Sequence, residues 1–204
     1  MIESSKKQRL IELVRKRGII RSTDVAAAGL PREYLSRMAK SGELIREKYG
    51  LYHLPDYEPN EHQSLIDVSQ SIRKGVICLL SALRFYDLTT QNPFEVWVAV
   101  ENKSYLPKID YPPVRVVYFS GAAFSFGVNL HDIGGVRVRI FNEAKTVVDC
   151  FKYRNKIGLE VALEALREGW QQKRFRIDEI NEYAEICRVK NVMRPYLEAL
   201  VTHD

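Results

Sequence analysis

Four polar residues in the segment 31–42 have the types and the spacing to bind a polyanion: Arg32, Ser36, Arg37 and Lys40. Because Leu35 and Met38 recur at helical spacing, we expect them to face inward and the four polar residues to face outward. An arginine can pair bidentately with a guanine edge, whereas lysine contacts mainly phosphate. These residues therefore favour binding of a nucleic acid over catalysis of a reaction.

Two short helices joined by a sharp turn are predicted to position this face. Ser22 can cap a helix over 22–28, and Gly29 can end it because glycine adopts the left-handed conformation that a helix end needs. Pro31 suits the first position of a second helix, which extends to Gly42. This arrangement is typical of a helix-turn-helix that places its second helix in a major groove.

A small hairpin is expected to follow as a wing. Strands over 43–45 and 51–54 flank a basic, glycine-bearing turn, and 19–21 is expected to pair with them as a third strand. The turn should lie on the DNA backbone or in the adjacent minor groove. The residues that we expect to contact DNA, from the helices and the wing together, are Arg21, Ser22, Thr23, Arg32, Ser36, Arg37, Lys40, Arg46, Lys48 and Tyr49.

The excess positive charge of the chain lies in the same region. Of 31 Lys and Arg and 26 Asp and Glu, residues 1–55 contain 12 and 6, so the rest of the chain contains 19 and 20. The formal net charge of +5 is therefore carried by the first quarter of the sequence. Such a concentration is typical of phosphate binding, and the alternative is the solvated face of a protein-docking module.

Composition and cysteine usage indicate a globular protein of a reducing compartment. Hydrophobic residues make up 46% of the 204 residues and charged residues 28%, which allows a sizeable core. Cys78, Cys150 and Cys187 are odd in number and lie in apolar segments, as small core residues do. No run of 18 apolar residues occurs, and the start lacks the apolar core of a signal peptide. We expect a cytoplasmic location.

A domain boundary is predicted where the basic excess ends. Residues 54–62 combine two prolines with acidic residues, as connectors do. We therefore expect a winged helix-turn-helix DNA-binding domain over 1–58 and a second domain over 59–204.

The second domain is expected to be α+β. Valine-rich and aromatic strands are predicted over 95–100, 114–119 and 136–141, and the glycines and prolines between them favour a mostly antiparallel sheet. Asn142 can cap a helix over 143–154, and other helices are predicted over 64–74, 158–170, 178–187 and 192–201. The last helices should form a C-terminal layer over the sheet. On the outer side of the helix over 143–154 we expect Asp149, Lys152, Tyr153 and Arg154.

No pattern for catalysis, metal binding or nucleotide binding occurs. The histidines and cysteines share no metal-ligand spacing, and HExxH, CxxC, GxxxxGK[ST] and GxSxG are absent. We therefore expect no catalytic residue, no metal and no cofactor. The alternative is a nuclease-like or protein-modifying site, and acids at strand ends are more often solvated turn residues. Its candidate residues are Asp87, Glu95, Glu101, Asp110 and Asp149.

One aromatic stretch has two interpretations. If it is exposed, it forms an interaction surface together with Arg137 and Arg139 of the next strand. The favoured alternative is that the rings fill the core between sheet and helices and that the arginines are solvated. The aromatic residues concerned are Tyr118, Phe119, Phe124 and Phe126.

With both domains described, nearly the whole chain resembles the AbiEi family of antitoxins from type IV toxin-antitoxin systems, which act in phage defence by abortive infection. The segments that carry the resemblance are GIIRSTDVAAAGLPREYLSRMAKSGELIREKYGLYHLP, SALRFYDLT, EVWVAV and NEAKTVVDCFKYRNKIGLEVALEALREG. The family often has Pro-Glu-Arg where this chain has Asn142-Glu143-Ala144, a departure that leaves the helix cap intact.

The resemblance implies two activities. The winged domain would repress the protein's own operon by binding inverted repeats in double-stranded DNA. The second domain would oppose a nucleotidyltransferase-like toxin, without a stable complex with it and without contact with a membrane. Two other functions stay open from the residues alone: an enzymatic second domain, or a winged domain that docks onto protein.

Overall fold

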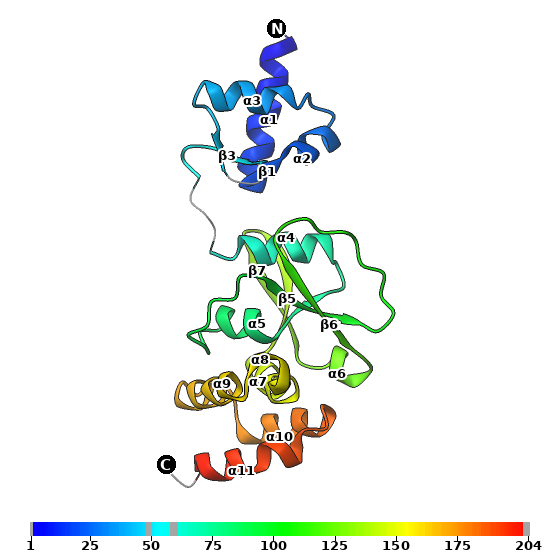
Figure 1. Cartoon of the computed structure of the whole chain (residues 1–204), viewed down its shortest axis with the longest axis vertical. Coiled ribbons are helices and arrows are strands. Elements are labelled where there is room, and N and C mark those ends of the chain that lie inside the picture. The colour runs from blue at the N-terminus through cyan, green and yellow to red at the C-terminus, as the bar shows by residue number, and fades with distance from the viewer. Residues whose placement is uncertain (1, 48–49, 58–60, 202–204) are drawn as a thin grey trace. The chain divides into compact units, whose positions relative to one another are not determined.

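The computed structural model describes residues 2–47, 50–57 and 61–201. The chain divides into two compact units, Met1–Asn60 and Glu61–Asp204, each with its own hydrophobic core (Figure 1). Whether each unit folds by itself stays a prediction.

The first unit is a winged helix-turn-helix, as its sequence predicts. Its elements are α1 (Ile2–Arg17), β1 (Ile19–Arg21), α2 (Ser22–Ala27), α3 (Glu33–Lys40), β2 (Ile45–Arg46) and β3 (Leu51–His53). The three strands form an antiparallel sheet in the order β1-β3-β2, so the predicted third strand is confirmed. The wing strands are each shorter than or shifted from the predicted ranges by one or two residues.

Glycines in the left-handed conformation end both helices of the helix-turn-helix. Gly29 has φ +70° and Gly42 has φ +77°. The backbone N–H of Leu30 donates to the carbonyl of Val25 (3.0 Å), which closes the end of α2 and turns the chain sharply toward α3. At the end of α3 the N–H of Glu43 donates to Met38 in the same way (2.9 Å).

The predicted cap of α2 is corrected by the structure. Ser22 is the first helical residue, and Arg21 occupies the capping position with extended backbone. The carboxylate of Asp24, three residues further on, accepts the backbone N–H of Arg21 (2.7 Å). The hydrogen bond that closes the start of α2 is therefore made by an acidic side chain in the first turn and not by a serine cap.

A small core holds the first unit together. Leu35 and Met38 of α3 are 1% and 2% exposed, as their helical spacing predicts. They pack in one cluster of buried residues from all three helices, the sheet and the connecting turns: Leu10, Val14, Ile20, Val25, Leu30, Tyr34, Leu35, Met38, Leu44 and Tyr52.

The second unit is an α+β domain, and this class is confirmed. Its elements before the last strand are α4 (Gln63–Ser71), β4 (Val76–Ile77), α5 (Leu79–Phe85), β5 (Val96–Glu101), β6 (Val114–Phe119), α6 (Ala122–Ser125) and β7 (Val128–Ile133). They are followed by β8 (Val136–Phe141), α7 (Glu143–Lys152), α8 (Arg154–Ile157), α9 (Leu159–Gln171), α10 (Ile177–Ile186) and α11 (Lys190–Val201). The C-terminal helices form the expected layer (Figure 1).

The sheet of the second unit is mixed, which corrects the expectation of mostly antiparallel pairing. Its order is β6-β5-β4-β8-β7; β5 with β6 and β4 with β8 are parallel, whereas β4 with β5 and β7 with β8 are antiparallel. Glycines and prolines mark where strands end, but only a short hairpin turn requires antiparallel pairing. The connection 102–113 is long enough to return the chain and start β6 in the direction of β5.

Helix α7 lies at the centre of the second unit, packed against α5, α9 and α10. The side chain of Asn142 accepts the N–H of Lys145 (2.8 Å), so the predicted cap is confirmed. Asp149 does not face outward as we had expected. It is fully buried and pairs with the equally buried Lys145 at 2.5 Å, because α7 is covered on all sides and polar residues on it need partners within the core.

This buried pair has further neighbours. The Lys145 ammonium lies 4.1 Å from the ring centre of Phe141 and 4.9 Å from that of Phe119. The thiol of Cys187 donates to the other carboxylate oxygen of Asp149 (3.4 Å). Burial raises the pKa of the Asp149 carboxyl above its ordinary value, against the opposing effect of Lys145.

Removing one partner of the pair should destabilise the second unit strongly. Lys145→Met leaves the Asp149 carboxylate buried without its ammonium, and we expect a loss of about 3–5 kcal/mol in the free energy of unfolding. Lys145→Met combined with Asp149→Leu should recover most of that loss. Urea unfolding of the full chain measures both.

The control is Arg194→Met, which removes a pair of the same i, i+4 spacing, with Glu198, whose side chains are 72% and 70% exposed. It should cost less than about 1 kcal/mol. A cost for Lys145→Met as small as that of the control would contradict a structural role for the buried pair.

Candidate nucleic-acid interface

Helix α3 presents a polar face to solvent. All four of its predicted DNA-contacting residues, Arg32, Ser36, Arg37 and Lys40, are exposed. Arg32 precedes the first helical residue, and the other three lie within the helix. Glu33 is exposed on the same side of the helix, although it was not among the residues that we predicted to contact DNA. A carboxylate there can accept from the amino group of a cytosine, whereas the cations suit guanine edges and phosphates.

Arg37 is supported by an aromatic ring of its own helix. Its guanidinium carbon lies 4.9 Å from the ring centre of Tyr34, a residue that is 9% exposed. Tyr34 was not singled out from the sequence, although its place three residues before Arg37 is the signal that could have identified it.

The wing repeats this arrangement on a strand. Arg46 of β2 is exposed and lies directly opposite Tyr52 of β3, with its guanidinium carbon 5.9 Å from the centre of that ring. The other two wing residues of the prediction, Lys48 and Tyr49, lie outside the described residues. The structure therefore places one of the three predicted wing contacts.

The remaining predicted contacts lie where β1 passes into α2. Arg21 ends β1 and is half-buried, Ser22 begins α2 and is also half-buried, and Thr23 is exposed. The neighbouring Asp24 is held in place by two groups, since one carboxylate oxygen accepts from Arg21 and the other pairs with Arg17 (2.8 Å).

Some basic residues of the first unit are engaged in ion pairs. Lys7 of α1 lies 2.6 Å from Glu43, and Arg17 pairs with Asp24. The hydrogen bonds from Lys7 and Ser41 lower the pKa of the Glu43 carboxyl below its ordinary value. These exposed pairs partly neutralise the positive charge of α1.

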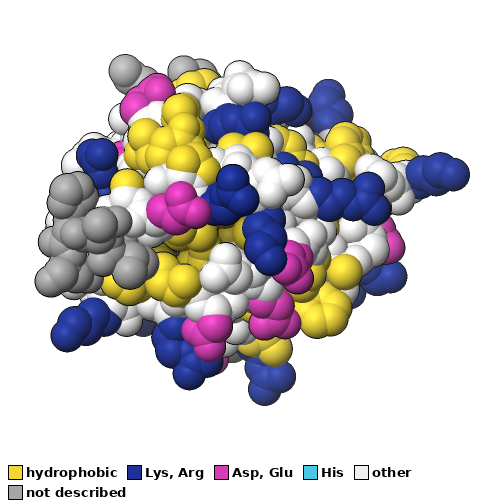
Figure 2. Space-filling model, turned by 90° about the horizontal axis from the view of Figure 1, so that it is seen from below, with side chains coloured by type: hydrophobic (Ala, Val, Ile, Leu, Met, Phe, Trp, Pro, Cys, Tyr) yellow, Lys and Arg dark blue, Asp and Glu magenta, His cyan; other side chains and the backbone are white. Residues whose placement is uncertain are grey.

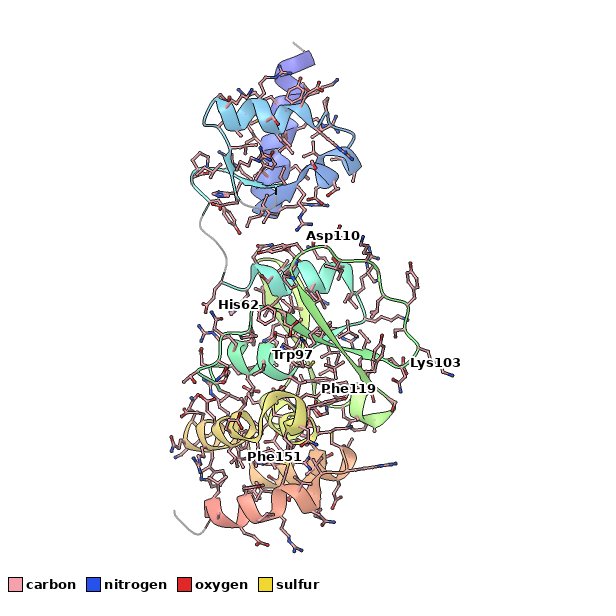
Figure 3. The ribbon with its side chains drawn as sticks, viewed as in Figure 1. His62, Trp97, Lys103, Asp110, Phe119 and Phe151 are labelled. Carbon is pink, nitrogen blue, oxygen red and sulfur yellow. The ribbon has the colours of Figure 1, made fainter. Side chains whose placement is uncertain are left out.

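Four of the five acidic residues that could have formed a nuclease-like site have other partners, whereas Glu101 is exposed at the end of β5. Asp87 lies 3.3 Å from Arg84, Glu95 pairs with Arg115, and Asp110 lies 3.8 Å from Lys108. Figure 3 shows Asp110 on the long connection between β5 and β6. Asp149 is buried with Lys145. In the described residues, His, Cys, Asp and Glu side chains do not gather in threes as metal ligands.

The aromatic stretch divides between core and surface. Phe119, which is labelled in Figure 3, is 2% exposed. Its ring lies beside those of Phe141 and Tyr153. Tyr118 and Phe126 are instead about half exposed, at 51% and 49%. The core interpretation therefore holds for Phe119. Tyr118 and Phe126 lie at the surface, and the described residues do not indicate what would bind there.

The end of the second unit formed by its C-terminal helices carries mixed charge. Figure 2 shows Lys and Arg side chains interspersed there with Asp, Glu and apolar side chains. Separately, no helix in the described ranges combines the length and the apolar character needed to cross a membrane.

Comparison with known protein families gives a match within the first unit. Residues 8–55 match the model of a family described as "Transcriptional regulator, AbiEi antitoxin". A search of curated proteins gave no match. The matched range contains α2, α3 and the three strands, and thus every residue of the candidate interface. Within the first unit, residues 8–55 are therefore similar to the transcriptional-regulator domain of the AbiEi antitoxin family.

Proposed function

We propose that this protein represses its own operon by binding inverted repeats in double-stranded DNA and serves as the antitoxin of a type IV toxin-antitoxin system. The observation that carries the DNA-binding part is the exposed polar face of α3, with Arg32, Ser36, Arg37 and Lys40. It lies within residues 1–55, which hold the whole basic excess of the chain, and within the range 8–55 that matches a regulator family. The protein would act in the cytoplasm, where its operon lies.

The geometry of the first unit supports a division of labour on DNA. Helix α3 would enter the major groove, with Arg37 reading a base edge and Lys40 on phosphate. Arg46 of the wing would meet the backbone or the minor groove next to it. The two halves of an inverted repeat are related by a two-fold axis, so we propose one protomer on each half-site, related by the same axis.

We propose that the second unit opposes the toxin, a nucleotidyltransferase-like protein, by an indirect route and without catalysis of its own. The support for a non-catalytic role is that Asp87, Glu95 and Asp110 each lie beside a basic side chain and Asp149 is buried. The support for antitoxin action is the family of the first unit.

Replacing the central arginine of α3 tests the groove assignment. Arg37→Ala should weaken binding to the protein's own upstream DNA by roughly 1–3 kcal/mol and relax its sequence preference, because a bidentate base contact is lost. Fluorescence anisotropy with operator and shuffled duplexes measures both. Arg167→Ala, which removes an exposed arginine of α9, is the matched control and should change neither. Equal operator affinity of folded Arg37→Ala and wild type would remove α3 from the groove.

The salt dependence of binding tests the number of phosphate contacts. About five Lys and Arg of the interface should neutralise phosphates in each protomer, so log affinity should fall against log salt concentration with a slope of roughly −4 to −5 per protomer. Arg46→Ala should reduce the magnitude of that slope by about 1. A slope near zero for the wild type would mean that the basic excess serves another purpose.

Fragments test the division between the two units. Residues 1–58 should bind operator DNA, more weakly if the second unit supplies contacts between neighbouring protomers. Residues 59–204 should protect cells from the toxin without binding DNA. Each fragment is expressed with the toxin from an unrelated promoter, and growth is scored. Protection by 1–58, or none from a folded 59–204, would assign neutralisation to the DNA-binding unit.

A further inference from the structure

Two arginines of the candidate interface lie over tyrosine rings that belong to the core of the first unit. The Arg37 guanidinium carbon is 4.9 Å from the centre of the Tyr34 ring, and that of Arg46 is 5.9 Å from the centre of the Tyr52 ring. Tyr34 and Tyr52 are 9% and 6% exposed and belong to one buried cluster. Because packing fixes the rings, each arginine has a fixed surface to lie on.

The backbone sets both contacts. Tyr34 and Arg37 are three residues apart on α3, so their side chains are neighbours on the helix surface. Arg46 and Tyr52 are direct partners in the antiparallel pair of β2 and β3, so their side chains project from the same face of the wing. The helix and the wing thus place an arginine over a ring by two independent geometries.

A contact between an arginine and an aromatic ring can aid recognition by holding the guanidinium in one orientation, without any change in charge. A guanidinium over an aromatic ring changes an equilibrium by roughly 2- to 5-fold at an exposed site and by more when water is excluded. A bidentate contact with a guanine also requires the planar guanidinium in one orientation. An arginine already held near that orientation loses less side-chain freedom on binding than one that moves freely.

We propose that Tyr34 is a positioning residue for Arg37 in operator recognition and that Tyr52 has the same role for Arg46 at the wing. This inference rests on the proposed function, since it assigns a partner to the residues that would read the DNA. If Tyr34 served only the core, its replacement would weaken binding through stability alone and without regard to Arg37.

A double-mutant cycle in the full chain separates these two roles. Operator affinity is measured by fluorescence anisotropy for wild type, Tyr34→Phe, Tyr34→Leu, Arg37→Ala and Tyr34→Leu with Arg37→Ala, and circular dichroism melting reports the fold. Tyr34→Phe keeps the ring and should bind within about 2-fold of wild type. Tyr34→Leu should weaken operator binding by roughly 3- to 10-fold and lower the preference for operator over shuffled DNA. In the Arg37→Ala background it should have no further effect.

The proposal is overturned if Tyr34→Leu weakens binding equally in both backgrounds, or if Tyr34→Phe behaves as Tyr34→Leu does. Should Tyr34→Leu fail to fold, NMR of the wild type decides: side-chain protons of Arg37, assigned with Arg37→Ala, should be shifted upfield by the ring, and unshifted resonances overturn the proposal. A wild type without operator preference removes the proposed function itself. If instead the wild type selects its operator and the effects of Tyr34→Leu and Arg37→Ala are additive, only the positioning role of Tyr34 fails.

Discussion

Burial of one side of α3 is the interaction on which the first unit depends. An eight-residue helix is not stable alone in water, so Leu35 and Met38 hold it in place by packing into the core. The same packing fixes which residues face solvent, and it places Tyr34 beneath Arg37. The left-handed glycines 29 and 42 complete the constraint, because they set the direction in which the chain enters and leaves this region. Burial of the apolar side of α3 therefore fixes the direction in which its polar side faces.

The two units solve different electrostatic problems. The first keeps its cations at the surface, where α3 and the wing carry several that point to solvent. The second buries Lys145 with Asp149 inside a helix that is packed against three others, and satisfies both with aromatic rings and the Cys187 thiol. The buried pair is enclosed by the core, whereas the cations of α3 and the wing lie at the surface. The exposed cations of α3 and the wing support the proposed DNA-binding role of the first unit.

Much of the fold could be predicted from local patterns, and the exceptions have physical reasons. Helical spacing identified the buried side of α3, and Asn142 was correctly predicted as a cap, because both depend on neighbours in sequence. The strand directions could not be predicted, since parallel pairing of β4 with β8 joins segments far apart in the chain. We predicted that Asp149 faces outward because a polar residue on a helix usually faces solvent. Its pairing with Lys145 follows only once the tertiary structure shows that other elements cover α7 on all sides. The candidate interface was predicted as a set of exposed cations, but the rings below them were not.

The most direct measurement of the central claim is a competition experiment with the full chain and the DNA upstream of its own gene. Affinity for that duplex is compared with affinity for a shuffled duplex of the same length and composition, at one stated salt concentration. We expect at least about 10³-fold preference for the upstream sequence, as specific DNA-binding proteins show. Equal affinity for the two duplexes would contradict sequence recognition by α3 and the wing and, with it, the proposed role of this protein as an operon repressor.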